Sequence, residues 1–246
     1  MTAPRPVALV TGAARRIGAA IATGLHAAGY DLALHYRDSA DEAAALQDTL
    51  ERERRNSTVL LRADLSETAR LPSLVERTVT RFGRLDALVN NASSFFPTPV
   101  GETSEAMWDA LMDSNAKAPY FLSQAAAFHL RQSHGAILNL GDIYAERPLA
   151  QHTVYCMAKA ALTMLTLSLA RELGPEVRVN AIAPGAILWP ESSTSQPLQE
   201  ALIARTTLKR CGNPADIAEA AVFLLSQAGY TSGQILRVDG GRWLTI

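Results

Sequence analysis

Short apolar runs alternate along the chain with longer segments in which apolar residues recur at helical spacing. The short runs are rich in Val, Leu and Ile, and the longer segments include residues 19–28, 41–55, 67–82 and 152–173, which we expect to be helices. This alternation is typical of β-α-β units around a parallel sheet. The pattern therefore predicts an α/β Rossmann fold, a doubly wound parallel sheet of about seven strands with helices on both faces. Strands are expected at residues 6–11, 31–36, 58–62, 87–90, 135–140, 178–182 and 235–238.

No repeat, low-complexity tract or linker interrupts this series, so we expect one catalytic domain over residues 1–246. The only long irregular stretch predicted, residues 184–197, is rich in Pro and Ser and begins a substrate loop expected at about 184–205. The composition is 48% hydrophobic with a formal net charge of -1, which argues against a nucleic-acid or anionic-membrane partner.

The first residues lack the apolar stretch of a signal peptide, and no uninterrupted apolar run is long enough to span a bilayer, so a cytoplasmic enzyme is expected. Cys156 and Cys211 are far apart in the sequence, and the histidines lack partners at metal-ligand spacing. No metal site is predicted.

Tyr155 and Lys159 lie four residues apart, which puts both side chains on one face of a helix. An unperturbed tyrosine has a pKa of roughly 10. An ammonium about 4 Å away favours the phenolate by at most about 4 kcal/mol. We therefore expect Lys159 to lower the pKa of Tyr155 toward neutrality, where the phenol is a useful proton donor. Taken alone, the pair is more simply a solvated helix face, and the rest of the chain decides its interpretation.

A glycine-containing turn, Thr11 to Gly18, follows the first expected strand and leads into a helix. Gly12 allows a tight turn, and Gly18 allows close packing at the start of the helix. The N–H groups at such a helix start attract a pyrophosphate. We therefore expect a dinucleotide site here, against the alternative of a purely structural turn.

The choice between NAD and NADP is expected at the end of the second strand. Tyr36 occupies the position where an acid would bind the ribose 2′-hydroxyl of NAD, and Arg37 follows it. Because the planar fork of an arginine suits a phosphate, NADPH/NADP is the predicted cofactor, and a pairing of Asp38 with Arg37 would weaken this preference. Asp64, after the third strand, is expected either to accept from the adenine amino group or to cap the next helix.

These segments together resemble the short-chain dehydrogenase/reductase family over nearly the whole chain. The resemblance implies that Tyr155 donates a proton, that Lys159 binds the nicotinamide ribose, and that Asn115 holds a water of the proton relay; Asn115 could instead be a local backbone cap. It rests on Thr11, Gly12, Gly18, Asp64, Asn90, Asn91, Ala92, Asn115, Tyr155, Lys159, Pro184, Gly185 and residues 238–241. The implied cofactor contacts are Gly12, Arg15, Arg16, Ile17, Gly18, His35, Tyr36, Arg37, Ser39, Asp64, Leu65, Asn91, Ala92, Ser93, Tyr155, Lys159, Pro184 and Gly185.

Three positions depart from the usual pattern of that family. Arg16 replaces the middle glycine of the turn, Ser93 replaces a glycine after Asn-Asn-Ala, and Asp142 stands where the catalytic serine is usual. A serine hydroxyl would polarise a ketone oxygen, whereas a carboxyl can exchange a proton with a ring nitrogen. Together with residues 35–36, 90–99 and 114–121, these departures resemble the pteridine reductases within the family.

This narrower resemblance implies a flat pterin between the nicotinamide and the ring of Phe95, held by stacking. Ser93 would hydrogen-bond the pterin, Arg16 would reach both the cofactor phosphate and the substrate, and Asp142 would form an acid pair with Tyr155. Phe95 could alternatively be a buried loop anchor. With Leu188 and Trp189 as candidate pocket walls, the expected substrate-binding residues are Arg16, Ser93, Phe95, Asp142, Tyr155, Leu188 and Trp189.

The predicted function is NADPH-dependent reduction of a pterin, dihydropterin or folate to the tetrahydro form. One alternative is an NADP-dependent reductase of ketones or 3-oxoacyl compounds; the other is a non-catalytic NADP-binding regulatory protein. The apolar residues around much of the helix at 152–173 exceed what one sheet contact requires. We therefore expect that helix to pack against a second subunit, and the family resemblance implies a homotetramer.

Overall fold

One seven-stranded parallel sheet in the order β3-β2-β1-β4-β5-β6-β7 forms the centre of the computed structural model, which describes residues 4–187 and 196–245. All seven predicted strands are present, with bounds within two residues of those expected. The doubly wound Rossmann fold predicted from the hydrophobic pattern is thereby confirmed. The strands are β1 (Val7–Val10), β2 (Asp31–Tyr36), β3 (Thr58–Arg62), β4 (Ala87–Asn90), β5 (Ala136–Leu140), β6 (Arg178–Pro184) and β7 (Ile235–Val238).

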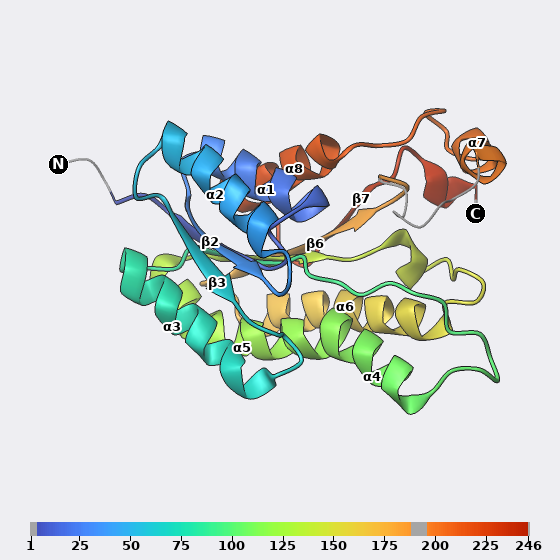
Figure 1. Cartoon of the computed structure of the whole chain (residues 1–246), viewed down its shortest axis with the longest axis horizontal. Helices are drawn as coiled ribbons and strands as arrows, with labels where there is room; N and C mark the ends of the chain where they lie inside the picture. Colours follow the sequence, from blue (N-terminus) through green and yellow to red (C-terminus); the bar gives the residue numbers. More distant parts are fainter. Residues whose placement is uncertain (1–3, 188–195, 246) are drawn as a thin grey trace.

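Helices cover both faces of the sheet (Figure 1). One face carries α1 (Arg16–Ala27), α2 (Ala40–Glu53) and α8 (Pro214–Val222). The other face carries α3 (Leu71–Phe82), α4 (Glu105–Met112), α5 (Ala118–Ser133) and α6 (Thr153–Glu172). Helix α7 (Gln196–Ala204) lies near the C-terminal end of the chain, away from both layers.

Side chains of each strand alternate between two cores, one on each face of the sheet. In β1, Ala8 and Val10 pack into the core beneath α1 and α8, whereas Leu9 packs into the core beneath α3 and α5. Because successive strand residues point to opposite faces, a strand buried on both sides reads as a continuous apolar run. This explains why the sequence pattern located the strands so closely.

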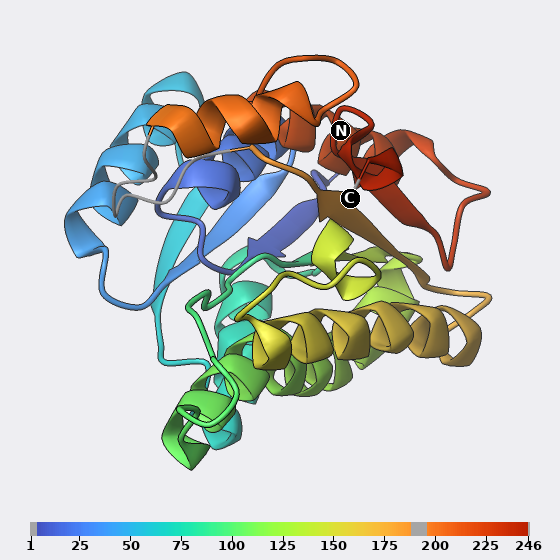
Figure 2. The same ribbon diagram turned by 90° about the vertical axis from the view of Figure 1, so that its right-hand side faces the viewer.

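The topology brings the segments that carry chemistry to one edge of the sheet. The strand order reverses between β1 and β4, which lie side by side, and ligands of open α/β sheets bind outside the carboxyl ends of the strands at such a point. Figure 2 shows the same arrangement turned by 90°. The glycine turn follows β1, the Asn90 to Ser93 segment follows β4, and Asp142 follows β5.

The expectation that the only long irregular stretch lies at residues 184–197 is wrong. Residues 91–104, with Pro97, Pro99 and Gly101, are irregular too, apart from a bridge between Thr98 and His152.

Helix α6 is the only helix among the described residues that is long and apolar enough to cross a membrane by length and composition, although Lys159 and several polar residues interrupt its apolar run. Within that helix 44% of the apolar window is buried inside the protein, and its buried residues include Tyr155 and Lys159.

Candidate active site

The glycine turn after β1 forms a close backbone cradle at the start of α1. Gly12 has a φ of +61°, which glycine adopts without strain. A Cβ on Gly18 would lie 2.1 Å from the carbonyl oxygen of Gly12, so no side chain fits there. No side chain caps the start of α1, and its first turn carries no acidic residue. A helix start with no side-chain cap and no repelling carboxylate fits a bound pyrophosphate.

Arg16 occupies the middle-glycine position of the turn in a glycine-like conformation, with a φ of +56°. An L-residue in the left-handed region costs about 1–2 kcal/mol. The side chain is exposed at the carboxyl edge of the sheet. The backbone of the turn is thus preserved, while an arginine replaces the hydrogen atom of the usual glycine.

The end of β4 is tied to the glycine turn by hydrogen bonds. The amide nitrogen of Asn91 donates to the carbonyl oxygens of Thr11 (2.8 Å) and Gly12 (3.1 Å). The backbone N–H groups of Asn91 and Ala92 donate to the hydroxyl of Thr11 at 2.9 and 3.0 Å. Asn91 and Ala92, which the resemblance implies to be cofactor contacts, therefore fix the glycine turn.

His35 lies underneath the glycine turn and is only 2% exposed. Its Nδ1 accepts from the Gly12 N–H at 3.2 Å, and Nε2 donates to the carbonyl oxygen of Ala63 at 3.2 Å. Burial lowers the pKa of His35 to about 4, so the ring is neutral at physiological pH. The structure thus shows His35 supporting the turn from below. The predicted direct contact of His35 with the cofactor does not fit this position, because its side chain is buried.

The side chains after β2 and β3 lie where an adenosine would be expected. Arg37 donates from Nε to the Asp38 carboxylate at 2.6 Å, the pairing that the sequence left open, and both side chains are exposed. Asp64 accepts from the N–H of Ser66 at 2.9 Å, and this bond lowers the pKa of its carboxyl. Tyr36 and Ser39 are half-buried and Leu65 is 8% exposed; Ile17 is half-buried in the first turn of α1.

Asp142 and Tyr155 meet at the carboxyl end of β5. The hydroxyl of Tyr155 donates to Oδ2 of Asp142 at 2.7 Å, and Oδ1 accepts from the N–H of Tyr144 at 2.8 Å. Lys159 follows one turn later on α6, and its Nζ donates to the carbonyl oxygen of Leu140 at 2.7 Å. The structure therefore brings together Tyr155 and Lys159, predicted from their spacing, and Asp142, predicted from the family resemblance, and Asp142 points toward Tyr155.

Burial governs the protonation of these three groups. It raises the pKa of the Asp142 carboxyl, against the lowering effects of the Tyr144 N–H, the Tyr155 hydroxyl, and the charges of Lys159 and Arg242. Burial and the adjacent Asp142 raise the pKa of Tyr155 well above its ordinary value. Burial also lowers the pKa of Lys159 to about 8.

The expectation that Lys159 brings the phenol of Tyr155 toward neutrality is wrong for this state of the protein. The Nζ of Lys159 lies 5.7 Å from the centre of the Tyr155 ring and bonds a carbonyl oxygen, whereas the carboxyl of Asp142 contacts the hydroxyl directly. A negative neighbour disfavours a phenolate. The phenol and the carboxyl thus form a pair that holds its proton strongly.

Asn115 lies in a π-helical turn, Asp113–Lys117, between α4 and α5 and is 1% exposed. Its amide nitrogen donates to the carbonyl oxygens of Ser94 (2.9 Å) and Leu111 (3.0 Å). Its amide oxygen accepts from the hydroxyl of Ser93 at 2.6 Å. Asn115 therefore fixes the segment that carries Ser93 and Phe95, a supporting contact in addition to the predicted relay role.

Phe95 stands beside the acid pair and is 46% exposed, so it is not a buried anchor. Its ring meets Tyr155 edge to face, with centroids 4.8 Å apart. His152 stacks on Phe95 at 4.7 Å with nearly parallel rings. An exposed aromatic ring next to Tyr155 offers a flat partner for a planar ring, and His152 is an aromatic neighbour that the sequence did not predict.

A buried polar chain beneath the site was not predicted either. The amide of Asn90 donates to Asn139 (2.8 Å) and to the hydroxyl of Ser123 (3.2 Å), and the amide of Asn139 donates to Thr166 (2.9 Å). These side chains link β4, β5, α5 and α6 under the cleft. Asn139 sits in an otherwise apolar strand, which was the one available sequence signal.

Pro184 and Gly185 end β6 at the same edge of the sheet. A Cβ on Gly185 would lie 2.7 Å from the Cα of Asp239, so the residue permits a close approach of the C-terminal segment. Leu188 and Trp189, the predicted pocket walls, lie outside the described residues. Within the expected substrate loop, the described part from residue 196 onward forms α7 rather than irregular chain.

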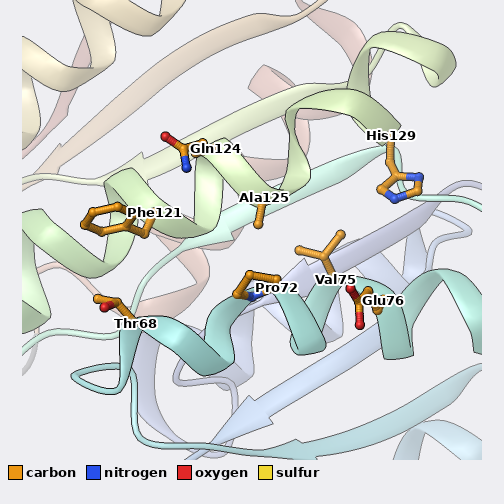
Figure 3. Close-up of a pocket in the computed structure, with 8 residues that line it drawn as sticks. All are labelled: Thr68, Pro72, Val75, Glu76, Phe121, Gln124, Ala125 and His129. Carbon is orange, nitrogen blue, oxygen red and sulfur yellow. The ribbon is translucent and has the colours of Figure 1, made fainter.

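A separate hollow of about 210 Å³ lies on the outer surface between α3 and α5, as Figure 3 shows. It is lined by Pro72, Val75, Phe121, Ala125 and His129, among others, and shares no residue with the predicted site. Within residues 4–187 and 196–245, no group of three or more His, Cys, Asp or Glu side chains is placed to hold a metal ion.

Comparison with known proteins matches residues 12–242 to the family model described as Enoyl-(Acyl carrier protein) reductase. Pteridine reductase 1 of Leishmania tarentolae is 37% identical, covering 98% of this chain and 97% of that protein. Ketoacyl reductase 2 of the granaticin polyketide synthase from Streptomyces violaceoruber is also 37% identical, over 97% of this chain and 96% of its own length. A 3-oxoacyl-acyl-carrier-protein reductase of Staphylococcus aureus is 34% identical, over 96% of this chain and 98% of that protein.

Proposed function

Because the chain belongs to the short-chain dehydrogenase/reductase family and is an oxidoreductase that uses a nicotinamide cofactor, we propose that it is a pteridine reductase. Its substrate is a pterin, dihydropterin or folate, which it reduces to the tetrahydro form with NADPH. One observation carries the proposal. The Asp142 carboxyl, at the place of the family's serine, lies 2.7 Å from the hydroxyl of Tyr155.

A carboxyl–phenol pair suits a ring nitrogen better than a ketone oxygen. A protonated carboxyl can give a proton and take it back, whereas an ionised one only accepts hydrogen bonds. The raised pKa of Asp142 favours its protonated form at higher pH than an exposed aspartate would allow. The pair therefore keeps a proton available for transfer to nitrogen.

When bound, NADPH supplies the hydride, which goes from C4 of the nicotinamide to a carbon of the pyrazine ring. The protein orients the substrate and delivers the proton. For reduction at C7, Tyr155 and Asp142 pass a proton to N8. For reduction at C6, the proton for N5 comes from water organised near Arg16. Lys159 binds the nicotinamide ribose and holds the end of β5 through its bond to Leu140.

The preference for NADPH over NADH rests on the end of β2. Tyr36 stands in place of the acid that would repel a 2′-phosphate, and the guanidinium of Arg37 is exposed beside it. Asp38 is paired with Arg37 at 2.6 Å and offsets part of its charge. We therefore propose a moderate preference for NADPH.

The ring of Phe95 supports a stacked planar substrate. It is 46% exposed and lies edge to face with Tyr155, so a flat ring next to it is also next to the proton donor. The hydroxyl of Ser93 is held toward this segment by its bond to Asn115 and retains acceptor capacity for a substrate amino group.

A carbonyl reductase is the second candidate, and the similarity to ketoacyl reductases at 34–37% identity favours it. It would use the same Tyr155 and Lys159, with Asp142 as a substrate contact. The two candidates differ in what Asp142 does, because a ketone needs no proton on a ring nitrogen. We place the reaction in the cytoplasm, with neither a membrane nor a nucleic acid as partner.

A substrate panel tests the proposal. Purified protein is mixed with NADPH and, separately, with dihydrobiopterin, folate, a simple ketone and a 3-oxoacyl thioester, and the loss of NADPH absorbance is followed. We expect turnover of dihydrobiopterin to exceed that of the ketone and the thioester. Preferred turnover of a carbonyl substrate would favour the second candidate, and NADPH binding without any turnover would favour a regulatory protein.

A further inference from the structure

Arg242, near the C-terminal end of the chain, is a buried cation that is only 4% exposed. It begins the short 3₁₀ turn Arg242–Leu244. One guanidinium nitrogen donates to the carbonyl oxygen of Leu202 in α7 at 3.2 Å, and the other donates to the phenol oxygen of Tyr144 at 3.3 Å. The guanidinium thus joins α7 to the loop that follows β5.

That loop is the one that carries Asp142. The N–H of Tyr144 donates to Oδ1 of Asp142 at 2.8 Å, while Oδ2 accepts from Tyr155 at 2.7 Å. The Arg242 contact is therefore made to the residue that orients the carboxyl. The charged and titratable groups that act on Asp142 are Tyr155 and Lys159 from α6 and Arg242 from the C-terminal turn.

The turn that presents Arg242 is itself held firmly. The carboxylate of Asp239 accepts from the N–H groups of Gly241 (2.9 Å) and Trp243 (2.7 Å). The hydroxyl of Thr207, just after α7, donates to the carbonyl oxygen of Gly241 at 3.0 Å. A Cβ on Gly241, whose φ is +78°, would lie 2.7 Å from Thr207. Arg242 therefore extends from a well-fixed backbone.

A second set of contacts joins the same two segments. The guanidinium of Arg147 lies 4.6 Å from the ring of Trp243, and that of Arg237 lies 4.2 Å from it. Arg237 also pairs with Glu146 at 2.6 Å. Glu146 and Arg147 directly follow the 3₁₀ turn Ile143–Ala145 after Asp142. Both sets of contacts hold the C-terminal turn against the Asp142 loop.

We propose that Arg242 is a positioning residue for the proton-transfer step. By joining α7 to Tyr144, whose N–H donates to Asp142, it holds the carboxyl of Asp142 within reach of Tyr155. The inference rests on the acid role that the proposed function gives to Asp142. It gives the C-terminal turn an indirect part in catalysis, through the position of Asp142 rather than through contact with the substrate.

The test compares Arg242→Gln, Arg242→Lys and Tyr144→Phe, with Arg52→Gln on the exposed surface of α2 as the matched control. For Arg242→Gln we expect kcat to fall roughly tenfold or more because the carboxyl is displaced, with NADPH affinity within about twofold of wild type. Because the charge of Arg242 lowers the pKa of Asp142, its removal should raise that pKa. The basic limb of the pH profile of kcat should therefore move to higher pH. Arg52→Gln should change none of these.

The other two variants separate position from charge. Arg242→Lys and Tyr144→Phe both keep a positive charge at position 242, so we expect kcat to fall while the basic limb of its pH profile stays at the wild-type pH. An Arg242→Gln enzyme with wild-type kcat and an unmoved limb would overturn the proposal, as would a loss of thermal stability with unchanged kinetics. If Arg242→Gln does not fold, wild-type kcat in both Arg242→Lys and Tyr144→Phe overturns it.

The measurements use folate, whose reduction at C7 takes a proton from the acid pair, or the substrate that the wild-type enzyme turns over if folate is not reduced. Activity on ketones without activity on pterins would contradict the proposed substrate, and the Arg242 variants would still be compared on the ketone. The two failures are therefore distinguishable.

Discussion

Three ionisable side chains, Asp142, Tyr155 and Lys159, share a small buried volume at the end of β5. Burial pushes all three toward their neutral forms, since it raises the pKa of the carboxyl and the phenol and lowers that of the ammonium to about 8. The direct bond between carboxyl and phenol keeps the two acids coupled. The chemistry therefore depends on which of these groups carries a proton at the working pH.

Lys159 gives a prediction about cofactor binding. Its ammonium is charged below a pH of about 8 and neutral above it. A group that must be charged to bind the ribose loses that contact as the pH rises through this value. We expect the Kd of NADPH, measured by fluorescence titration, to increase above a pH of about 8, by up to about tenfold per pH unit.

Lys159→Arg serves as the control, because a guanidinium keeps its charge throughout this range. If the variant binds NADPH at all, its Kd should be flat where that of the wild type rises. A wild-type Kd that is constant between a pH of about 7 and about 9.5 would contradict the charge assigned to Lys159.

The strands and the acid pair were predictable because their signals are local. Each strand is a run of apolar residues, Tyr155 and Lys159 follow from their spacing, and Asp142 follows from the family resemblance, as the residue in place of the usual serine. Arg242 was not predictable, because its contact with Tyr144 joins residues 98 positions apart and an arginine in a terminal segment normally reads as solvated. The sequence led us to expect a lowered pKa for Tyr155, whereas burial raises it, and burial was not visible in the sequence.

Elements around the cleft are joined by polar bonds as well as by apolar packing. The chain of side chains from Ser123 through Asn90 and Asn139 to Thr166 connects two strands and two helices, and Asn90, Ser123, Asn139 and Thr166 are all buried. Buried networks of this kind are stabilising when complete and costly when one member is removed. They also fix β5 and α6, which carry the acid pair, relative to each other.

Asn139→Leu tests this network. Removal of the central amide takes one hydrogen-bond partner each from Asn90 and Thr166, which keep their bonds to Ser123 and to the carbonyl oxygen of Leu162. A buried polar group that loses a partner costs about 1–3 kcal/mol. We expect the free energy of unfolding in urea to fall by about 2–4 kcal/mol. Thr166→Val removes only the last member and should lose about half as much. An Asn139→Leu protein as stable as wild type would show that the network contributes nothing.

The glycine turn makes a second prediction at this scale. Arg16 is held in a left-handed conformation that glycine adopts readily, so Arg16→Gly relieves backbone strain while it adds freedom to the unfolded chain. We expect the free energy of unfolding to change by less than about 1 kcal/mol, since the two effects oppose each other. The KM for the pterin should rise by roughly tenfold, because a charged hydrogen-bond donor is lost.

Asn56→Gly is the matched control, since Asn56 also has a positive φ, of 62°, but lies between α2 and β3. It should show a similarly small stability change and wild-type kinetics. Equal KM values for Arg16→Gly and wild type would remove Arg16 from the substrate site.

At the scale of the whole molecule, one surface formed by α5 and α6 is unusually apolar. Tyr120, Phe128, Met157, Met164 and Leu167 are each between 41% and 64% exposed. Exposed apolar patches on this scale mark interaction surfaces. The apolar residues around α6 were the reason to predict a subunit contact. Some of them are buried inside the protein, and the others are exposed on this surface.

We therefore predict that the α5 and α6 surface mediates self-association, with a homotetramer as the complete assembly. Met164→Lys places a charge in the middle of the patch, where an association would have to bury it. Light scattering coupled to gel filtration should show a smaller particle than the wild type. Val100→Lys, at a loop position that is 92% exposed, is the control and should leave the mass unchanged. Equal masses for all three proteins would contradict this surface.

The replacement of Asp142 by the usual serine of the family tests the central claim most directly. We predict that Asp142→Ser lowers kcat/KM for folate, whose first reduction is at C7 and takes its proton from the acid pair, by at least about 100-fold, because positioned proton transfer contributes about that much. The Kd of NADPH should stay within about twofold of wild type, since Asp142 is not placed in the phosphate or adenosine site. Unchanged folate kinetics in Asp142→Ser would contradict the account.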